Sequence, residues 1–321
     1  MNRTTDSSLA DVQERLMQLG YDIPIIELGN LGTETTKAIV SYQEIHGLTP
    51  TGKLDTQTWN ELTTSSYKLG DRLLYERQPL FRGEDVAELQ HHLNALGFDA
   101  GREDGFFRAE TAQALREFQR NMGISSDGIC GPNTVLALKR VNTFASSSAT
   151  NLREQVQWQL RDNSKVYRAG VCLDPTFTVI GDRLIKELFE RGMKVPLYYE
   201  GGDESEIAAE ANSSNLDFLF SLKPSFGAGG RCIFFSNNRY RSMVGAALAG
   251  SIQHELSKIV KSDPDDAVGR MYPLLRESKM PSVIIELCDT SDITMVQLVR
   301  ERSTQIAQAV ADGIYSVIES K

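Results

Sequence analysis

The sequence has few of the residues that hold metal ions and no excess of the residues that bind nucleic acid. Its 321 residues include four histidines and four cysteines, and no two cysteines have the CxxC spacing of a metal finger. Acidic residues outnumber basic ones by 43 to 34, which gives a formal net charge of −9. This balance argues against a nucleic-acid-binding protein, which usually carries a basic face.

Long apolar stretches are also missing. No apolar run is long enough for a membrane span, and the N-terminal segment lacks the apolar core of a secretory signal. Three of the cysteines, Cys172, Cys232 and Cys288, lie in apolar, strand-like runs, where a buried reduced thiol is the usual state. Together these features predict a cytoplasmic protein.

What the sequence does contain is an internal repeat. The segment VQERLMQLGY, which starts at Val12, matches LQHHLNALGF, which starts at Leu89. Further matches follow in the same order, including Thr35 with Thr111, at a nearly constant offset of 76 or 77 residues. Apolar residues at helical spacing, glycines at helix ends and turn motifs predict three short helices in each copy.

Both copies resemble the peptidoglycan-binding domain family, whose pattern contains LQ..L..LGF, DG.F, FQ and DG..G..T. The second copy has these elements, and the resemblance implies that its candidate ligand-binding residues are Asp104, Phe106, Phe118 and Gln119. The first copy has GNLG at residues 29–32 in place of DG.F, so its ligand groove is expected to differ. An alternative stays open, because most matches are core and turn positions and such a repeat can equally serve as a protein-contact surface.

Composition and pattern divide the chain into five segments. The stretch between the repeats is locally basic, with Arg72, Arg77 and Arg82, and a solvated linker is its simplest interpretation. Small polar residues after the second repeat predict a flexible hinge, followed by a helix that contains Leu152 and Leu160. The segments are repeat 1 at 1–65, a linker at 66–82, repeat 2 at 83–140, a linker and helix at 141–164, and an α/β domain at 165–321.

Apolar runs and amphipathic stretches alternate from about residue 165 onward. This alternation predicts an open, mostly parallel sheet with helices on both faces. The fold class is therefore multidomain, with two small all-α three-helix repeats followed by an α/β domain. Ligands of such sheets bind beyond the carboxyl ends of the strands. The predicted strands are 167–173, 195–199, 218–222, 232–235 and 282–287.

The order of these elements and several local motifs resemble the zinc-dependent N-acetylmuramoyl-L-alanine amidase family. VCLDP at 171–175 is similar to the family's first strand and DPGHGG signature, and residues 208–221 are similar to AN...D.F.SIHAN. Residues 280–287 are similar to MP..LVELGF. The resemblance implies a zinc ion held by two histidines and a glutamate, with a second glutamate as general base. Such a ligand set leaves one zinc position open for the water nucleophile.

At the matching positions this sequence departs from the family. Phe177 and Lys223 stand where the two histidines are expected, and the loop that carries the ligand glutamate is absent. Asp174 remains, and Glu286 stands at the position of the catalytic glutamate. The domain contains one histidine, His254, so a site with two histidines cannot form. We therefore predict a degenerate site without zinc or another cofactor, in which Glu286 is a relic.

Lys223 has two interpretations. An ammonium group in the former metal position could hold an anionic group such as a phosphate or a carboxylate. Alternatively, Lys223 forms an ion pair with Glu286 or another acid, or points into solvent.

The repeats and the degenerate amidase-like domain together predict a non-catalytic, peptidoglycan-related binding or regulatory protein. The combination looks like the cytoplasmic amidase-like regulators of actinobacteria, and this resemblance implies control of cell-wall precursor synthesis. The implied partners are peptidoglycan or its precursors, UDP-N-acetylglucosamine enolpyruvyl transferase and a serine/threonine kinase. The alternatives are an active or divergent zinc N-acetylmuramoyl-L-alanine amidase in peptidoglycan turnover, and a wall-anchoring module outside the cell.

Overall fold

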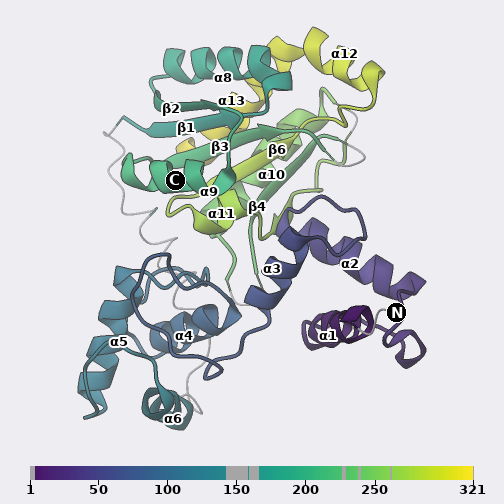
Figure 1. Cartoon of the computed structure of the whole chain (residues 1–321). Coiled ribbons are helices and arrows are strands. Elements are labelled where there is room, and N and C mark those ends of the chain that lie inside the picture. Colours follow the sequence, from purple (N-terminus) through teal and green to yellow (C-terminus); the bar gives the residue numbers. More distant parts are fainter. Residues whose placement is uncertain are drawn as a thin grey trace. The chain divides into compact units, whose positions relative to one another are not determined.

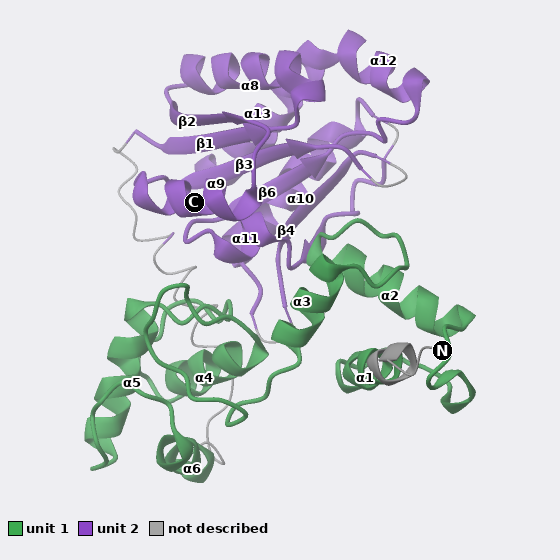
Figure 2. Cartoon of the chain, viewed as in Figure 1, with its two compact units in different colours: residues 1–150 green, residues 151–321 purple. Residues whose placement is uncertain are grey.

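The computed structural model describes residues 4–141, 158, 166–225, 229–237, 240–260 and 262–320. The chain forms two compact units, residues 1–150 and 151–321 (Figure 2). The predicted helix with Leu152 and Leu160, and most of the predicted linker at 141–164, lie outside the described residues. In the described ranges, no helix combines the length and the apolar character that crossing a bilayer requires.

Unit 1 contains two successive sets of three α-helices, which confirms the prediction from the repeat (Figure 1). Each set surrounds its own apolar core, with Leu16, Ile39 and Leu62 in the first and Leu93, Phe118 and others in the second. A short 3-10 helix, η1 (Ile25–Glu27), lies between the first two helices. The helices are α1 (Thr4–Gln18), α2 (Thr33–His46), α3 (Thr56–Ser65), α4 (Glu84–Ala95), α5 (Ala109–Asn121) and α6 (Pro132–Val141).

Buried glutamines fix the loops of both repeats, and we call them glutamine clasps. On α1, the Gln13 amide accepts the Gly29 N–H at 2.7 Å and donates to the Thr35 hydroxyl at 3.0 Å. Gln90 on α4 makes the equivalent bonds in repeat 2. Both glutamines are almost fully buried, and a hydrogen bond of this kind contributes about 1 kcal/mol to stability. The clasps therefore hold the loop between the first and second helix of each repeat.

A second clasp holds the loop between the second and third helix. Gln43 on α2 accepts the Gly52 N–H at 2.9 Å and donates to the Thr58 hydroxyl at 2.9 Å. Gln119 on α5 does the same for its own loop. Gly52 has a φ of 66°, a left-handed conformation that favours glycine. The paired glutamines and glycines thus explain part of the sequence repeat in structural terms.

Part of the stretch 66–82 packs against repeat 2 through the buried Leu69, Leu74 and Phe81, whereas residues 75–79 are exposed. Arg72 donates to both carboxylate oxygens of the buried Asp85, at 2.7 and 3.0 Å. Its guanidinium also lies 4.1 Å from the ring centre of Tyr67. A backbone bridge joins Leu74 to Cys130. A bidentate bond to a buried carboxylate needs the planar guanidinium, so the basic character of this stretch has a packing role.

Unit 2 is built on one six-stranded sheet, in the order β2-β1-β3-β6-β4-β5. The first four strands in this order are parallel, β4 is antiparallel to β6, and β5 is parallel to β4. This arrangement confirms the predicted open, mostly parallel sheet. The strands are β1 (Arg168–Leu173), β2 (Lys194–Glu200), β3 (Phe218–Lys223), β4 (Arg231–Phe235), β5 (Val268–Arg270) and β6 (Ser282–Glu286).

Helices cover both faces of the sheet (Figure 1). Adjacent strand residues contribute to opposite faces, as the two-residue period of a strand requires. Ile285 packs in the cluster with α8, α10 and α13, whereas Ile284 packs in the cluster with α9 and α11. Because both faces are covered, the strands are continuous apolar runs. The helices are α8 (Thr178–Glu190), α9 (Glu204–Ser213), α10 (Met243–Ser257), α11 (Pro273–Glu277), α12 (Ile293–Glu301) and α13 (Ser303–Glu319).

Candidate functional site

Three predicted site residues meet at the carboxyl ends of neighbouring parallel strands. Asp174 follows β1, Lys223 ends β3 and Glu286 ends β6. Lys223 and Glu286 are direct partners in the register of β3 and β6. By the alternation along each strand, both side chains lie on the face that α9 and α11 cover. This is the edge where ligands of parallel sheets bind.

Phe177 does not join this cluster. Asp174 accepts the Thr176 N–H at 2.9 Å and caps a short 3-10 helix, η3 (Pro175–Phe177). The turn places the Phe177 ring, which is 2% exposed, in the apolar cluster with Leu184 of α8. Burying an aromatic ring of this kind stabilises the fold by about 1.5–3 kcal/mol. Phe177, which stands where the amidase family has a histidine, therefore packs into the core on the opposite face of the sheet.

Lys223 forms an ion pair with Glu204, in the first turn of α9. The other carboxylate oxygen of Glu204 accepts the Leu274 N–H at 2.9 Å, in the first turn of α11. Burial lowers the pKa of Lys223, and the negative charges of Glu286 and Asp174 oppose that shift. The sequence left open whether Lys223 holds an anionic ligand or forms an internal ion pair, and the structure shows an ion pair. Its partner, Glu204, was not identified from the sequence. Glu204 joins the sheet to α9 and α11.

Glu286 is 6% exposed and accepts a hydrogen bond from the Tyr272 hydroxyl at 3.1 Å. Burial raises the pKa of Glu286, while the Tyr272 bond and the charges of Arg231 and Lys223 oppose the rise. Arg231 lies opposite Glu286 in the antiparallel pair of β4 and β6. Its Nε donates to Asp266 at 2.9 Å. We call Lys223, Glu204, Glu286, Tyr272 and Arg231 the strand-end cluster.

The strand-end cluster does not fit a zinc ion. Zinc in enzymes is held by neutral imidazoles, thiolates and carboxylates, without a cation among them. Here an ammonium group and a guanidinium flank the remaining glutamate, and His254 is an exposed residue of α10. Within the described ranges, no three histidine, cysteine, aspartate or glutamate side chains are grouped so that they could hold a metal.

The four candidate ligand residues of repeat 2 lie inside the repeat. Asp104 is 4% exposed, and its carboxylate accepts from Arg108 at 2.5 Å. Phe106 is also buried, and Phe118 packs edge-on against Phe98. Gln119 is a glutamine clasp whose amide bonds the loop that follows α5. In this structure these side chains hold the repeat together.

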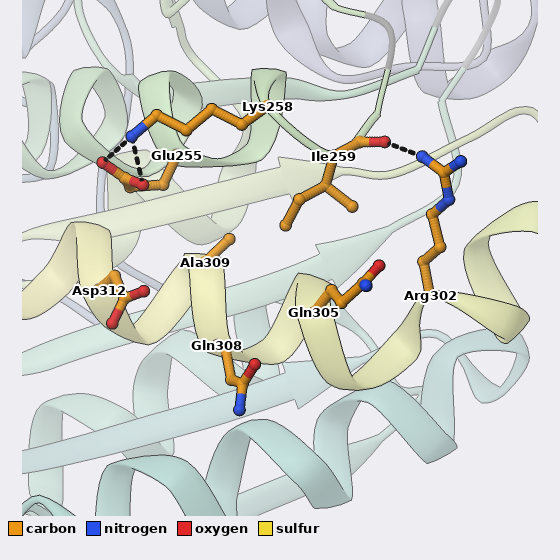
Figure 3. Close-up of a pocket in the computed structure, with 8 residues that line it drawn as sticks. All are labelled: Glu255, Lys258, Ile259, Arg302, Gln305, Gln308, Ala309 and Asp312. Atoms are coloured by element: carbon orange, nitrogen blue, oxygen red, sulfur yellow. Dashed lines mark hydrogen bonds and ion pairs between the residues drawn. The ribbon is translucent and has the colours of Figure 1, made fainter.

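A groove of about 530 Å³ lies between α10 and α13, on the other side of the sheet from the strand-end cluster (Figure 3). Lys258 pairs with Glu255 beside it, and Arg302 donates to the Ile259 carbonyl. Asp312, Gln305 and Gln308 complete its polar lining. Two acids balance two bases, so the groove has no net charge with which to select an ion.

Comparison with known proteins connects these observations to two families. Residues 5–62 and 82–138 each match the model of the putative peptidoglycan binding domain. Residues 174–316 match the model of N-acetylmuramoyl-L-alanine amidase. The chain carries two peptidoglycan-binding repeats and an amidase-family domain. Both resemblances of the sequence are thereby confirmed, and the protein is an amidase-like, peptidoglycan-related protein.

Several individual proteins that resemble this chain carry the name N-acetylmuramoyl-L-alanine amidase. N-acetylmuramoyl-L-alanine amidase CwlM of Mycobacterium tuberculosis is 28% identical over 98% of this chain and 84% of its own length. A probable N-acetylmuramoyl-L-alanine amidase of Bacillus licheniformis is 31% identical, over 40% of this chain and 41% of its own. A crystal structure of an N-acetylmuramoyl-L-alanine amidase from Clostridium difficile 630 aligns with 49% of this amidase-like chain and 100% of its own, at 19% identity and a TM-score of 0.40.

Proposed function

We propose that this protein is a non-catalytic, peptidoglycan-related regulator whose amidase-family domain has lost its zinc site. The observation that carries the proposal is the Lys223–Glu204 ion pair at the strand ends, next to the buried Glu286. A fixed positive charge in this position repels a divalent cation. Glu204 also accepts the Leu274 N–H, so both of its carboxylate oxygens are engaged within the domain.

Loss of zinc removes the source of the nucleophile in amide hydrolysis. In an active amidase the metal would lower the pKa of bound water to about 7 and polarise the scissile carbonyl. A carboxylate alone supplies neither effect, and Glu286 is held by the Tyr272 hydroxyl.

The regulatory part of the proposal concerns cell-wall precursor synthesis in the cytoplasm. We propose UDP-N-acetylglucosamine enolpyruvyl transferase as the target and a serine/threonine kinase as the input, following the resemblance to the actinobacterial amidase-like regulators. The repeats support a protein-binding role, because the side chains expected to contact peptidoglycan in repeat 2 are used internally. Cell fractionation tests the location, and recovery with the wall fraction would favour a wall-anchoring module.

The first test is the metal content of the purified full chain after zinc exposure and desalting, measured by elemental mass spectrometry. We expect well under one zinc per ten chains, and no release of L-alanine-linked peptide from peptidoglycan. An active zinc amidase treated in parallel is the positive control. Near-stoichiometric zinc together with amide cleavage would replace the proposal with an active amidase.

The second test is an assay of purified UDP-N-acetylglucosamine enolpyruvyl transferase with and without the full chain. Phosphate release reports the enzyme's rate, and the chain is used before and after treatment with the kinase. We expect the rate to change with the chain present, in a manner that depends on kinase treatment. An unchanged rate in both conditions would contradict the regulatory role.

A further inference from the structure

Repeat 1 exposes a group of large aliphatic side chains in one short loop. The side chains of Ile25 and Ile26 are 84% and 89% exposed, Leu31 is 59% exposed and Leu28 is 40% exposed. Single exposed apolar residues are ordinary on protein surfaces. Here four lie within residues 25–31, and groups of exposed apolar residues mark interaction sites. We call residues 25–31 the apolar loop.

The apolar loop is held rigidly from beneath. Gln13 donates to the Glu27 and Asn30 carbonyls at 2.7 and 2.9 Å, and it accepts the Gly29 N–H. The Glu27 carboxylate accepts the Thr35 N–H at 2.8 Å, at the start of α2. The polar groups of the loop are thus directed inward. The aliphatic side chains are left outside on a fixed backbone, which reduces the entropy that a partner must remove on binding.

Repeat 2 provides an internal control for this loop. Its equivalent segment, between α4 and α5, is held by the same type of clasp, from Gln90 to the Gly105 N–H at 2.9 Å. With Gly29 aligned to Gly105, that segment has Gly101, Arg102 and Asp104 at the places of Ile25, Ile26 and Leu28. The buried Phe107 stands at the place of Leu31. The fold therefore forms without aliphatic side chains at the first three places, and no folding role explains the exposed Ile25, Ile26 and Leu28 of repeat 1.

The surroundings of the apolar loop indicate what binds it. No lysine or arginine occurs between Arg15 and Lys37, whereas this stretch contains Asp22, Glu27 and Glu34. Lys37 pairs with Glu34 at 2.8 Å, and the three acids and one lysine of residues 16–37 leave a net charge of −2 around the loop. An anionic membrane attracts basic segments and repels acidic ones. A second copy of the loop would bring like charges together, and a glycan offers no apolar surface of matching size.

We propose that the apolar loop docks into an apolar cleft, rimmed by lysine or arginine, on a folded protein partner. The aliphatic side chains fill the cleft, and the net negative charge around the loop attracts the basic rim. This inference rests on the proposed regulatory function, because it names the surface through which repeat 1 contacts a protein. Electrostatic complementarity of this kind sets the partner and the association rate, while the buried side chains supply the affinity.

The test begins with the full chain carrying a photo-crosslinking phenylalanine derivative at position 26, irradiated in living cells. The matched control carries it at Leu136, an exposed apolar residue of α6 in repeat 2 that is 54% exposed. We expect one protein adduct specific to position 26, identified by mass spectrometry, with the crosslink beside apolar and basic residues of the partner. Adducts with lipid, adducts with a second copy, or the absence of a specific adduct would each overturn the proposal.

The identified partner is then purified and titrated with the full chain by calorimetry. We expect Ile26→Asp to weaken binding by about tenfold or more, and Leu136→Asp to change it less than about twofold. Ile26→Ser, which adds no charge, serves as a second variant, and circular dichroism verifies that each variant is folded. Equal affinity of wild type, Ile26→Asp and Ile26→Ser would overturn the docking role.

The two proposals fail in distinguishable ways. If the chain changes the rate of the enolpyruvyl transferase but Ile26→Asp does so equally, the docking role of the loop is wrong and the regulatory function stands. If the adduct forms and Ile26→Asp weakens its binding while precursor synthesis is unaffected, the loop is a docking site and the proposed regulatory target is wrong.

Discussion

The glutamine clasps of unit 1 and the ion pair of the strand-end cluster in unit 2 are two different ways of using a buried polar side chain. In unit 1, neutral glutamines such as Gln119 hold loops within their own repeat. In unit 2, the charged pair of Lys223 and Glu204 joins a strand to two helices that lie apart in the sequence. An amide clasp fixes the local path of the chain, whereas the ion pair fixes how layers pack. In both units, residues that the family resemblance marks for ligands are engaged internally.

The largest effect is expected from removing a clasp. Gln119→Leu leaves the Gly128 N–H and the Ile129 carbonyl without their buried partner, and should lower the free energy of unfolding of repeat 2 by about 2–3 kcal/mol. Hydrogen exchange of repeat 2 peptides in the full chain measures this. Gln113→Leu, at an exposed position of the same helix, should change stability by less than about 0.5 kcal/mol. Equal effects of the two variants would show that the clasp is dispensable.

Removing the Lys223 ammonium group from the strand-end cluster should have an intermediate effect on stability. Lys223→Met leaves Glu204 without its ion pair, and we expect a loss of about 1–2 kcal/mol, because the pair is only partly screened by solvent. The control is Lys186→Met, which breaks an exposed pair with Glu190 on α8 and should cost under about 0.5 kcal/mol. Hydrogen exchange of unit 2 peptides in the full chain measures the stability of both variants. The double variant Lys223→Met/Glu204→Met should recover part of the loss, and full additivity would argue against the pair.

The smallest effect is a pH dependence centred on Glu286. Its pKa in the folded state is raised from 4.5. The stability that the protonated Glu286 contributes is therefore fully present below pH 4.5 and is lost as the pH rises through the folded pKa. Glu286→Gln does not titrate, and its stability relative to wild type should therefore increase over that window. Tyr272→Phe removes a hydrogen bond that lowers the Glu286 pKa, and should extend the window to higher pH. Urea unfolding at several pH values measures both shifts, and parallel curves for Glu286→Gln and wild type would contradict the raised pKa.

Much of the fold follows from periodicity in the sequence. Among the described residues, the helical period and the glycine ends predicted the six α-helices of unit 1, and the apolar runs predicted five of the six strands of unit 2. β5 was missed because its three residues, Val268–Arg270, are too short to show a period. The reversed direction of β4 was missed too, since an apolar run has the same pattern in either direction.

The site was predictable only in part. Asp174, Lys223 and Glu286 were expected to form the degenerate site because they match motif positions of the amidase family, and in the structure they lie at the carboxyl ends of neighbouring strands. Glu204 and Tyr272 come from a helix start and a loop, where an acid and an aromatic residue carry no signal of their long-range partners. Phe177 was expected beside them, but the gain from burying its ring directs it into the core.

The glutamine clasp has a consequence for how a repeat can acquire a new binding specificity. Because Gln13 sets the loop path from inside, the outward residues 25, 26, 28 and 31 can be exchanged without altering the backbone that presents them. Shape and chemical identity are thereby controlled by separate residues. The repeat is in this sense a display scaffold, and randomising those four positions should yield folded variants with new binding preferences.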